Sequence, residues 1–174
     1  LDEYINRKAK HEEKKNGVIL MGGSLDRSIP VSQLAAEFNF NFELYNKSEA
    51  GLSLSEAGNY FSKKIASLMP EGIIIHLGEN DSVLARTNPS LFDTYYLSLI
   101  QTIKACNKAC RIALVSVDNP ENDKSIDAMN AHIKAIAQAE KASYISLENA
   151  KFWHPESVKA ASNFAYRMGL NIRK

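Results

Sequence analysis

The sequence lacks several features that would point to particular classes of protein. Its 174 residues include only two cysteines, and Lys and Arg (21) nearly balance Asp and Glu (20). No basic stripe is interleaved with aromatic residues, which argues against a nucleic-acid partner. No apolar run approaches the roughly 20 residues that a membrane-spanning helix requires. We therefore expect neither nucleic-acid binding nor a membrane span.

The two cysteines do not form a framework of disulfides or metal ligands. Cys106 and Cys110 lie near the end of a predicted helix, where a disulfide would require the helix to end between them. A metal site would require further ligands close by. We interpret both as partly buried thiols, which leaves the compartment undecided between secreted, cell-surface and cytoplasmic.

The remaining composition is that of a single globular domain. Hydrophobic residues make up 45% and charged residues 24% of the chain. Residues 1–16 are rich in Lys, Arg and Glu, and we predict that they form a charged helical leader or linker. Residues 17–174 are predicted to fold as one domain. Since the chain starts at Leu1 rather than Met, we expect a trimmed N-terminus.

Apolar, β-branched runs alternate with helical patterns along the chain. Strands are predicted at residues 17–21, 40–45, 73–77, 111–117 and 144–147. Helices are predicted at residues 31–38, 53–68, 90–103, 126–137 and 155–170, and residues 78–88 are predicted to be a long polar connection. Because parallel strands need helical crossovers, we predict an α/β fold, a three-layer α/β/α sandwich with about five parallel strands.

Two glycine-rich turns follow predicted strands. Gly22-Gly23-Ser24-Leu25 comes after the first strand, and Gly78-Glu79-Asn80-Asp81 comes after the third. Open α/β sheets bind ligands outside the carboxyl ends of their strands. A serine hydroxyl there could be a nucleophile, and an asparagine amide could stabilise an oxyanion. The alternatives are a structural or phosphate-binding serine and an asparagine that caps the backbone.

Two further residues complete a possible set for acyl transfer. His154 lies after the last predicted strand, between Trp153 and Pro155, and could act as a general base. Gly51 follows the second predicted strand, where its N–H could donate to an oxyanion. By contrast, His76 lies within the third predicted strand and is interpreted as a core histidine.

These four segments resemble the four blocks of the SGNH hydrolases, the GDSL lipase/esterase superfamily. That family contributes Ser, Gly, Asn and His in this order, and the resemblance extends from about Gly17 to the C-terminus. The matching segments are Gly22-Gly23-Ser24-Leu25, Gly51, Gly78-Glu79-Asn80-Asp81 and His154-Pro155. The resemblance implies a flavodoxin-like fold and a serine esterase without metal or organic cofactor.

The resemblance also implies a role for each matching residue. Ser24 would be the nucleophile. The backbone N–H groups of Ser24 and Gly51, together with the Asn80 amide, would form the oxyanion hole. His154 would be the general base for attack and then the acid for the leaving alcohol.

Two positions depart from the family pattern. Gly23 stands where the family has Asp before the serine, and Lys151 stands where it has the acid three residues before the histidine. A lysine cannot accept the histidine N–H, and losing a triad acid can cost roughly 10⁴-fold in rate. A backbone carbonyl could orient His154 instead, or another acid could; Glu148 is the nearest acid before His154 in the sequence, and Glu79 or Glu156 are alternatives.

Two functions follow from these patterns. The first is a serine esterase that hydrolyses a small carboxylic ester through an acyl-enzyme, for example an O-acetyl group on a carbohydrate. The same residues would serve acyl transfer to an alcohol other than water. The second is a catalytically silent SGNH-like module that binds its ligand but has lost the triad acid at Lys151.

Overall fold

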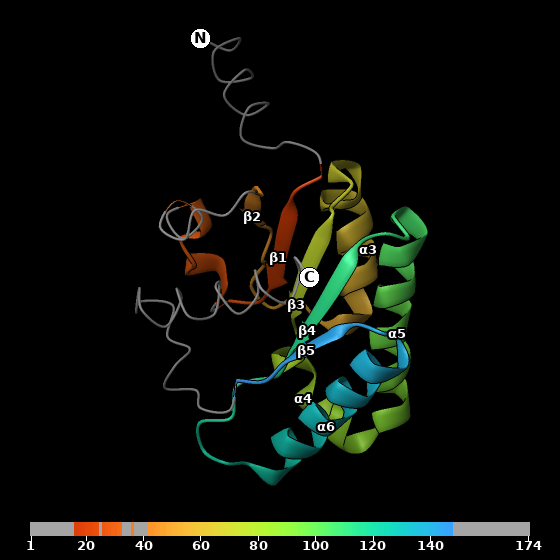
Figure 1. Ribbon diagram of the computed structural model, residues 1–174. Helices are drawn as coiled ribbons and strands as arrows, with labels where there is room; N and C mark the ends of the chain where they lie inside the picture. The colour runs from red at the N-terminus through yellow and green to blue at the C-terminus, as the bar shows by residue number, and fades with distance from the viewer. Residues whose placement is uncertain (1–15, 25, 33–35, 37–41, 148–174) are drawn as a thin grey trace.

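The computed structural model describes residues 16–24, 26–32, 36 and 42–147 (Figure 1). The strands are β1 (Val18–Gly22), β2 (Leu44–Asn46), β3 (Gly72–His76), β4 (Arg111–Val115) and β5 (Ser143–Ile145). The helices are α3 (Leu54–Lys64), α4 (Ser82–Thr87), α5 (Pro89–Cys106) and α6 (Lys124–Ala139), with short 3₁₀ turns η1 (Asp26–Ser28), η2 (Ala66–Leu68) and η3 (Glu79–Asp81). None of the helices in these ranges is both long and apolar enough to cross a membrane.

The five strands form one parallel sheet in the order β2-β1-β3-β4-β5. This is the flavodoxin-like order, so the predicted α/β fold with about five parallel strands is confirmed. From β1 the chain goes to β2 on one side, whereas β3 lies on the other side of β1. The carboxyl ends of β1 and β3 therefore flank the topological switch point, where such sheets bind ligands.

Both faces of the central strands are buried. All five residues of β1 and all five of β3 are buried, which fits their continuous apolar sequences. Helices α3, α5 and α6 cover one face (Figure 1) and pack on alternate strand residues such as Ile19 and Ile75. Leu20, Ile74 and Val115 belong to the core on the other face. Each such side chain contributes about 1.5–3 kcal/mol by burial, so the sheet is a rigid base for its connecting turns.

The two long helices begin where their sequences supply caps. Asn88 Oδ1 accepts a hydrogen bond from Leu91 N (3.3 Å) at the start of α5, and Pro89 occupies its first turn. Asp123 Oδ1 accepts one from Ser125 N (2.8 Å) at the start of α6. These caps fix the directions in which the helices cross back over the sheet.

Residues 78–88 and strand β2 differ from their predictions, and β4 and β5 each end two residues earlier than predicted. Residues 78–88 are not a polar connection, because they contain η3 and α4, and Leu84 and Ala85 of α4 pack against the core. Helix α4 has only six residues, which is too short for its apolar residues to show a helical period. Strand β2 begins at Leu44, and the described residues 42 and 43 before it are not part of the strand, although Glu43 O already accepts a hydrogen bond from Val18 N (2.8 Å).

Several predictions concern segments outside the described residues. These are the leader up to residue 15, most of the helix at residues 31–38 and the helix at residues 155–170. They stay predictions. Cys106 and Cys110 are described and are free thiols, partly buried and buried, so their interpretation as thiols is confirmed.

Candidate active site

Ser24, Gly51 and Asn80 all lie beyond the carboxyl ends of neighbouring strands. Ser24 is exposed in the turn after β1, and Asn80 is exposed in η3 after β3. Gly51 is exposed in the loop after β2, the strand on the other side of β1. Three of the four residues predicted for the site therefore lie along one edge of the sheet.

Backbone hydrogen bonds tie the loop before Gly51 to the end of β1. Glu49 N donates to Gly22 O (3.0 Å), and Gly22 N donates to Ser48 Oγ (3.0 Å). Ser48 is oriented in turn, because its own N–H donates to Asn46 Oδ1 (3.1 Å). The loop that carries Gly51 is thus attached just before the turn that carries Ser24.

The Asn80 turn is attached to the other end of the same loop. Asn80 Nδ2 donates to Leu52 O (3.3 Å), next to Gly51. Both carboxylate oxygens of Asp81 accept from Leu54 N (3.2 Å each), at the start of α3. Asp81 is buried, and burial raises the pKa of its carboxyl group. Asp81 therefore has a structural role that holds Asn80 beside Gly51.

Two glycines in these segments have backbone conformations that other residues rarely adopt. Gly78 has φ +121°, and a Cβ there would lie 2.9 Å from Val117 Cγ2. Gly51 has φ +74°, with open space where a side chain would be. The left-handed conformation, rather than crowding, accounts for glycine at position 51.

A buried polar group lies beneath the Ser24 turn. His76 Nδ1 is 2.7 Å from Asp26 Oδ1, and His76 Nε2 is 3.8 Å from Asp118 Oδ1. Only 7% of His76 and 2% of Asp26 are exposed. Among the described residues, Asp118 Oδ1 has no hydrogen-bond partner. His76 is buried as predicted, but it is paired with carboxylates at the candidate site.

Burial and neighbouring charges shift the pKa values of His76 and Asp118. Burial lowers the pKa of His76, but the charge and hydrogen bond of Asp26, with the charges of Asp118 and Glu79, outweigh burial and raise this pKa from 6.5 to about 9. Burial raises the pKa of Asp118 to about 6, although the charge of His76 opposes that rise. His76 is therefore a cation near neutral pH.

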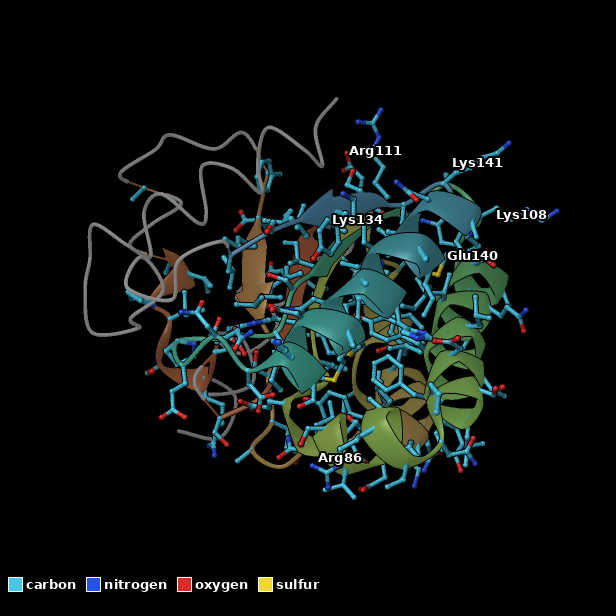
Figure 2. All side chains as sticks on the ribbon, turned by 90° about the horizontal axis from the view of Figure 1, so that it is seen from below. Arg86, Lys108, Arg111, Lys134, Glu140 and Lys141 are labelled. Carbon is cyan, nitrogen blue, oxygen red and sulfur yellow. The ribbon has the colours of Figure 1, made fainter. Side chains whose placement is uncertain are left out.

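Two of the hollows lined by described residues lie at opposite edges of the sheet. One of about 50 Å³ is lined by His76, Leu77, Glu79, Val117 and Asp118 at the carboxyl ends of β3 and β4. One of about 370 Å³ includes Lys104, Arg111, Glu140 and Lys141 at the amino ends of β4 and β5. Figure 2 shows Arg111 and Lys141 extending outward, far from Arg86 on α4. The switch-point rule favours the carboxyl edge for chemistry, despite the larger volume at the other edge.

The remaining predicted site residues divide between the described and undescribed parts of the chain. His154, Lys151, Glu148 and Glu156 lie outside the described residues. Glu79 is described, and its carboxylate lies against Gly23, where a Cβ would overlap Glu79 Oε1. Within the described ranges, no group of three His, Cys, Asp or Glu side chains is arranged to hold a metal ion.

Asp26 and Asp118 were not predicted as site residues from the sequence. Asp26 is two residues beyond Ser24, and Asp118 is three residues beyond β4. The sequence did hold one indication that polar partners are present, namely His76 at the end of an otherwise apolar strand. Such a side chain needs a polar partner, but the sequence does not say which one.

Solved structures resemble this chain, whereas no protein-family model and no curated protein matches it. An acetyl xylan esterase, AlAXEase, matches with a TM-score of 0.70 at 15% identity, over 87% of this chain and 97% of that chain. The psychrotrophic esterase EstA from Pseudoalteromonas sp. matches with a TM-score of 0.68 at 17% identity, over 91% and 97%. A GDSL-like lipase from Bacteroides thetaiotaomicron matches with a TM-score of 0.66 at 18% identity, over 99% and 94%. The chain therefore has the fold of esterases and GDSL-like lipases, as its resemblance to the SGNH hydrolases predicted.

Proposed function

We propose that this protein is a serine esterase that hydrolyses a small carboxylic ester through an acyl-enzyme. The observation that carries the proposal is the joining of three loops at the switch point of the sheet. Glu49 N bonds Gly22 O, and Asn80 Nδ2 bonds Leu52 O, so the segments around Ser24, Gly51 and Asn80 adjoin one another. A hydroxyl, a glycine N–H and a side-chain amide on adjoining segments are the groups that acyl transfer needs.

In this mechanism Ser24 Oγ attacks the ester carbonyl carbon while His154 takes the hydroxyl proton. The negative charge that develops on the carbonyl oxygen is stabilised by the N–H groups of Ser24 and Gly51 and by the Asn80 amide. The intermediate collapses to an acyl-enzyme, and the leaving alcohol takes the proton from His154. Water then attacks the acyl group by the same route, which releases the acid and restores Ser24.

The orientation of His154 needs a group other than Lys151. Glu148 is the nearest acid that precedes His154 in the sequence. Glu79 is a second candidate, because its carboxylate lies against the backbone of the Ser24 turn. A Ser–His dyad oriented by a backbone carbonyl is the third arrangement, and it would still leave catalysis from the oxyanion hole.

Two of the fold neighbours support a proposal for the substrate class. Two of the similar structures are an acetyl xylan esterase and an acetyl-xylooligosaccharide esterase. We therefore propose an acetyl ester, such as an O-acetyl group on a carbohydrate.

Labelling with a fluorophosphonate probe tests the nucleophile directly. The probe should form a covalent adduct on Ser24, identified by mass spectrometry of the modified peptide, because only an activated serine reacts readily. The variant His154→Ala should lose the label, since it lacks the proposed base. A folded wild-type protein that takes no label would contradict the proposal and would favour a silent binding module.

The Asn80 amide is expected to contribute to the rate rather than to binding. Asn80→Ala should lower kcat for p-nitrophenyl acetate on the order of 10²-fold with little change in KM, because the amide acts on charge that develops in the transition state. Asn59→Ala is a matched control, since Asn59 is exposed on α3. Equal kcat values for Asn80→Ala and wild type would remove Asn80 from the oxyanion hole.

A further inference from the structure

The side chain of Asp26 folds back onto the turn that carries Ser24. Its Oδ2 accepts a hydrogen bond from Gly23 N (2.9 Å), the residue directly before Ser24. A Cβ on Gly22 would overlap the Asp26 carboxylate, so this carboxylate packs directly on the backbone of the turn. The backbone of Asp26 is also fixed, because its carbonyl accepts from Asn46 Nδ2 (2.6 Å) at the end of β2.

His76 anchors the other oxygen of Asp26 to the sheet. His76 Nδ1 is 2.7 Å from Asp26 Oδ1, and both side chains are more than nine-tenths buried. In the sheet register His76 is paired with Gly22, so the histidine belongs to the strand that runs beside the turn. Both carboxylate oxygens of Asp26 are thus engaged: Oδ2 binds the N–H of Gly23 in the turn, and Oδ1 binds His76 of β3.

We propose that Asp26 and His76 are positioning residues that hold the turn from Gly22 to Ser24, so that the hydroxyl and N–H of Ser24 face the ester. This inference rests on the proposed function, in which Ser24 is the nucleophile. The physical reason is that reaction rates depend steeply on geometry: a displacement of about 1 Å at the reacting atoms can cost about 10²-fold. A buried, charge-assisted hydrogen bond is suited to prevent such a displacement.

His76 acts through Asp26 and is not an alternative general base. Within the described ranges, three carboxylates face it: Asp26 from η1, Asp118 after β4 and Glu79 from η3. Its Nδ1 is engaged by Asp26, and Nε2 is directed to Asp118. With the pKa of His76 raised to about 9, the imidazole already carries its proton at neutral pH and cannot take another from a serine.

The test compares the loss of the hydrogen bond with its partial restoration. His76→Leu and Asp26→Ala should lower kcat for p-nitrophenyl acetate, and the rate of fluorophosphonate labelling of Ser24, by roughly 10²-fold with KM nearly unchanged. His76→Asn should recover most of this loss, because its amide places an N–H close to the position of Nδ1. Equal losses in His76→Asn and His76→Leu would overturn positioning through this hydrogen bond.

A second His–Asp pair in the same chain provides the matched control. His132 Nδ1 is 2.9 Å from Asp93 Oδ1, between α6 and α5 and away from the Ser24 turn. His132→Leu removes a hydrogen bond of the same kind, so it should leave the labelling rate of Ser24 unchanged. If His76→Leu and Asp26→Ala are folded and labelled as fast as His132→Leu, the inference is wrong.

Hydrogen exchange at one amide separates this inference from the proposed function. The Gly23 N–H should be protected in wild type and in His132→Leu, and should exchange at least tenfold faster in Asp26→Ala and His76→Leu. Unchanged exchange at Gly23 in both variants would overturn the inference, whatever the activity. Faster exchange in Asp26→Ala and His76→Leu, together with a wild-type protein that takes no label, would support positioning of the turn and refute only the esterase. Asp26→Asn, which keeps the side-chain shape, serves if Asp26→Ala does not fold.

Discussion

Ser24→Ala is expected to lower kcat/KM for p-nitrophenyl acetate by about 10⁵-fold. The variant removes the hydroxyl that forms the acyl-enzyme, so what remains is the activity of the oxyanion hole and of substrate binding alone. Because Ser24 is exposed in a turn, the substitution should not disturb the core. The rates are best compared by initial-velocity kinetics with protein of matched purity.

A control for this substitution is available on α3. Ser62 is an exposed serine on that helix, and Ser62→Ala should keep the wild-type rate. Hydrolysis by Ser24→Ala at the rate of Ser62→Ala would show that another group, or a contaminant, is responsible. The assignment of Ser24 as nucleophile would then be abandoned.

The free energy of unfolding is expected to fall by roughly 3 kcal/mol between about pH 6.5 and pH 9, through His76 alone. The folded protein holds the His76 proton up to a pKa of about 9, whereas the unfolded chain releases it near 6.5. Between these values the folded state binds more protons, so stability falls as pH rises. The contribution is fully present below pH 6.5 and lost above pH 9.

Urea denaturation at several pH values measures this effect. The difference in free energy of unfolding between wild type and His76→Asn should shrink as pH rises from 6.5 to 9, because the variant has no proton to lose. Asp118 titrates lower, with a pKa raised to about 6, so it contributes below this window. Parallel curves for the two proteins would mean that His76 is not held as a cation in the folded state.

The sequence predicted the sheet well because its strands carry a strong and simple pattern. Runs such as 18–21 and 73–75 are apolar on both faces, and only a strand covered on both sides buries every residue. The predicted boundaries of β1 and β3 differ from the observed ones by one residue at each end. The positions of Ser24 and Asn80 at the carboxyl edge of the sheet could then be predicted, because these residues lie in the turns after β1 and β3.

The polar group beneath the site could not be predicted in the same way. Asp26, His76 and Asp118 come from three separate segments, and their proximity is set by the order of the strands rather than by spacing along the chain. A single polar residue in a turn carries no period that a pattern could reveal. The roles of Ser24, Gly51, Asn80 and His154 stay predictions, and His154 lies outside the described residues.

Each hydrogen bond that joins the three loops has a backbone atom on at least one side, and this has a consequence for how freely the sequence can change. Glu49 N, Gly22 O, Leu52 O and Leu54 N are atoms that almost any residue at those positions would supply, whereas Ser48, Asn80 and Asp81 contribute side-chain groups. Many substitutions at positions 49 and 52 should therefore preserve the hydrogen bonds between the three loops, provided that an apolar side chain stays buried at position 52. A site joined in this way restricts a few positions, namely 48, 80 and 81, and leaves the positions that supply only backbone atoms free to vary. Such freedom is compatible with a TM-score of 0.70 at 15% identity and of 0.66 at 18% identity.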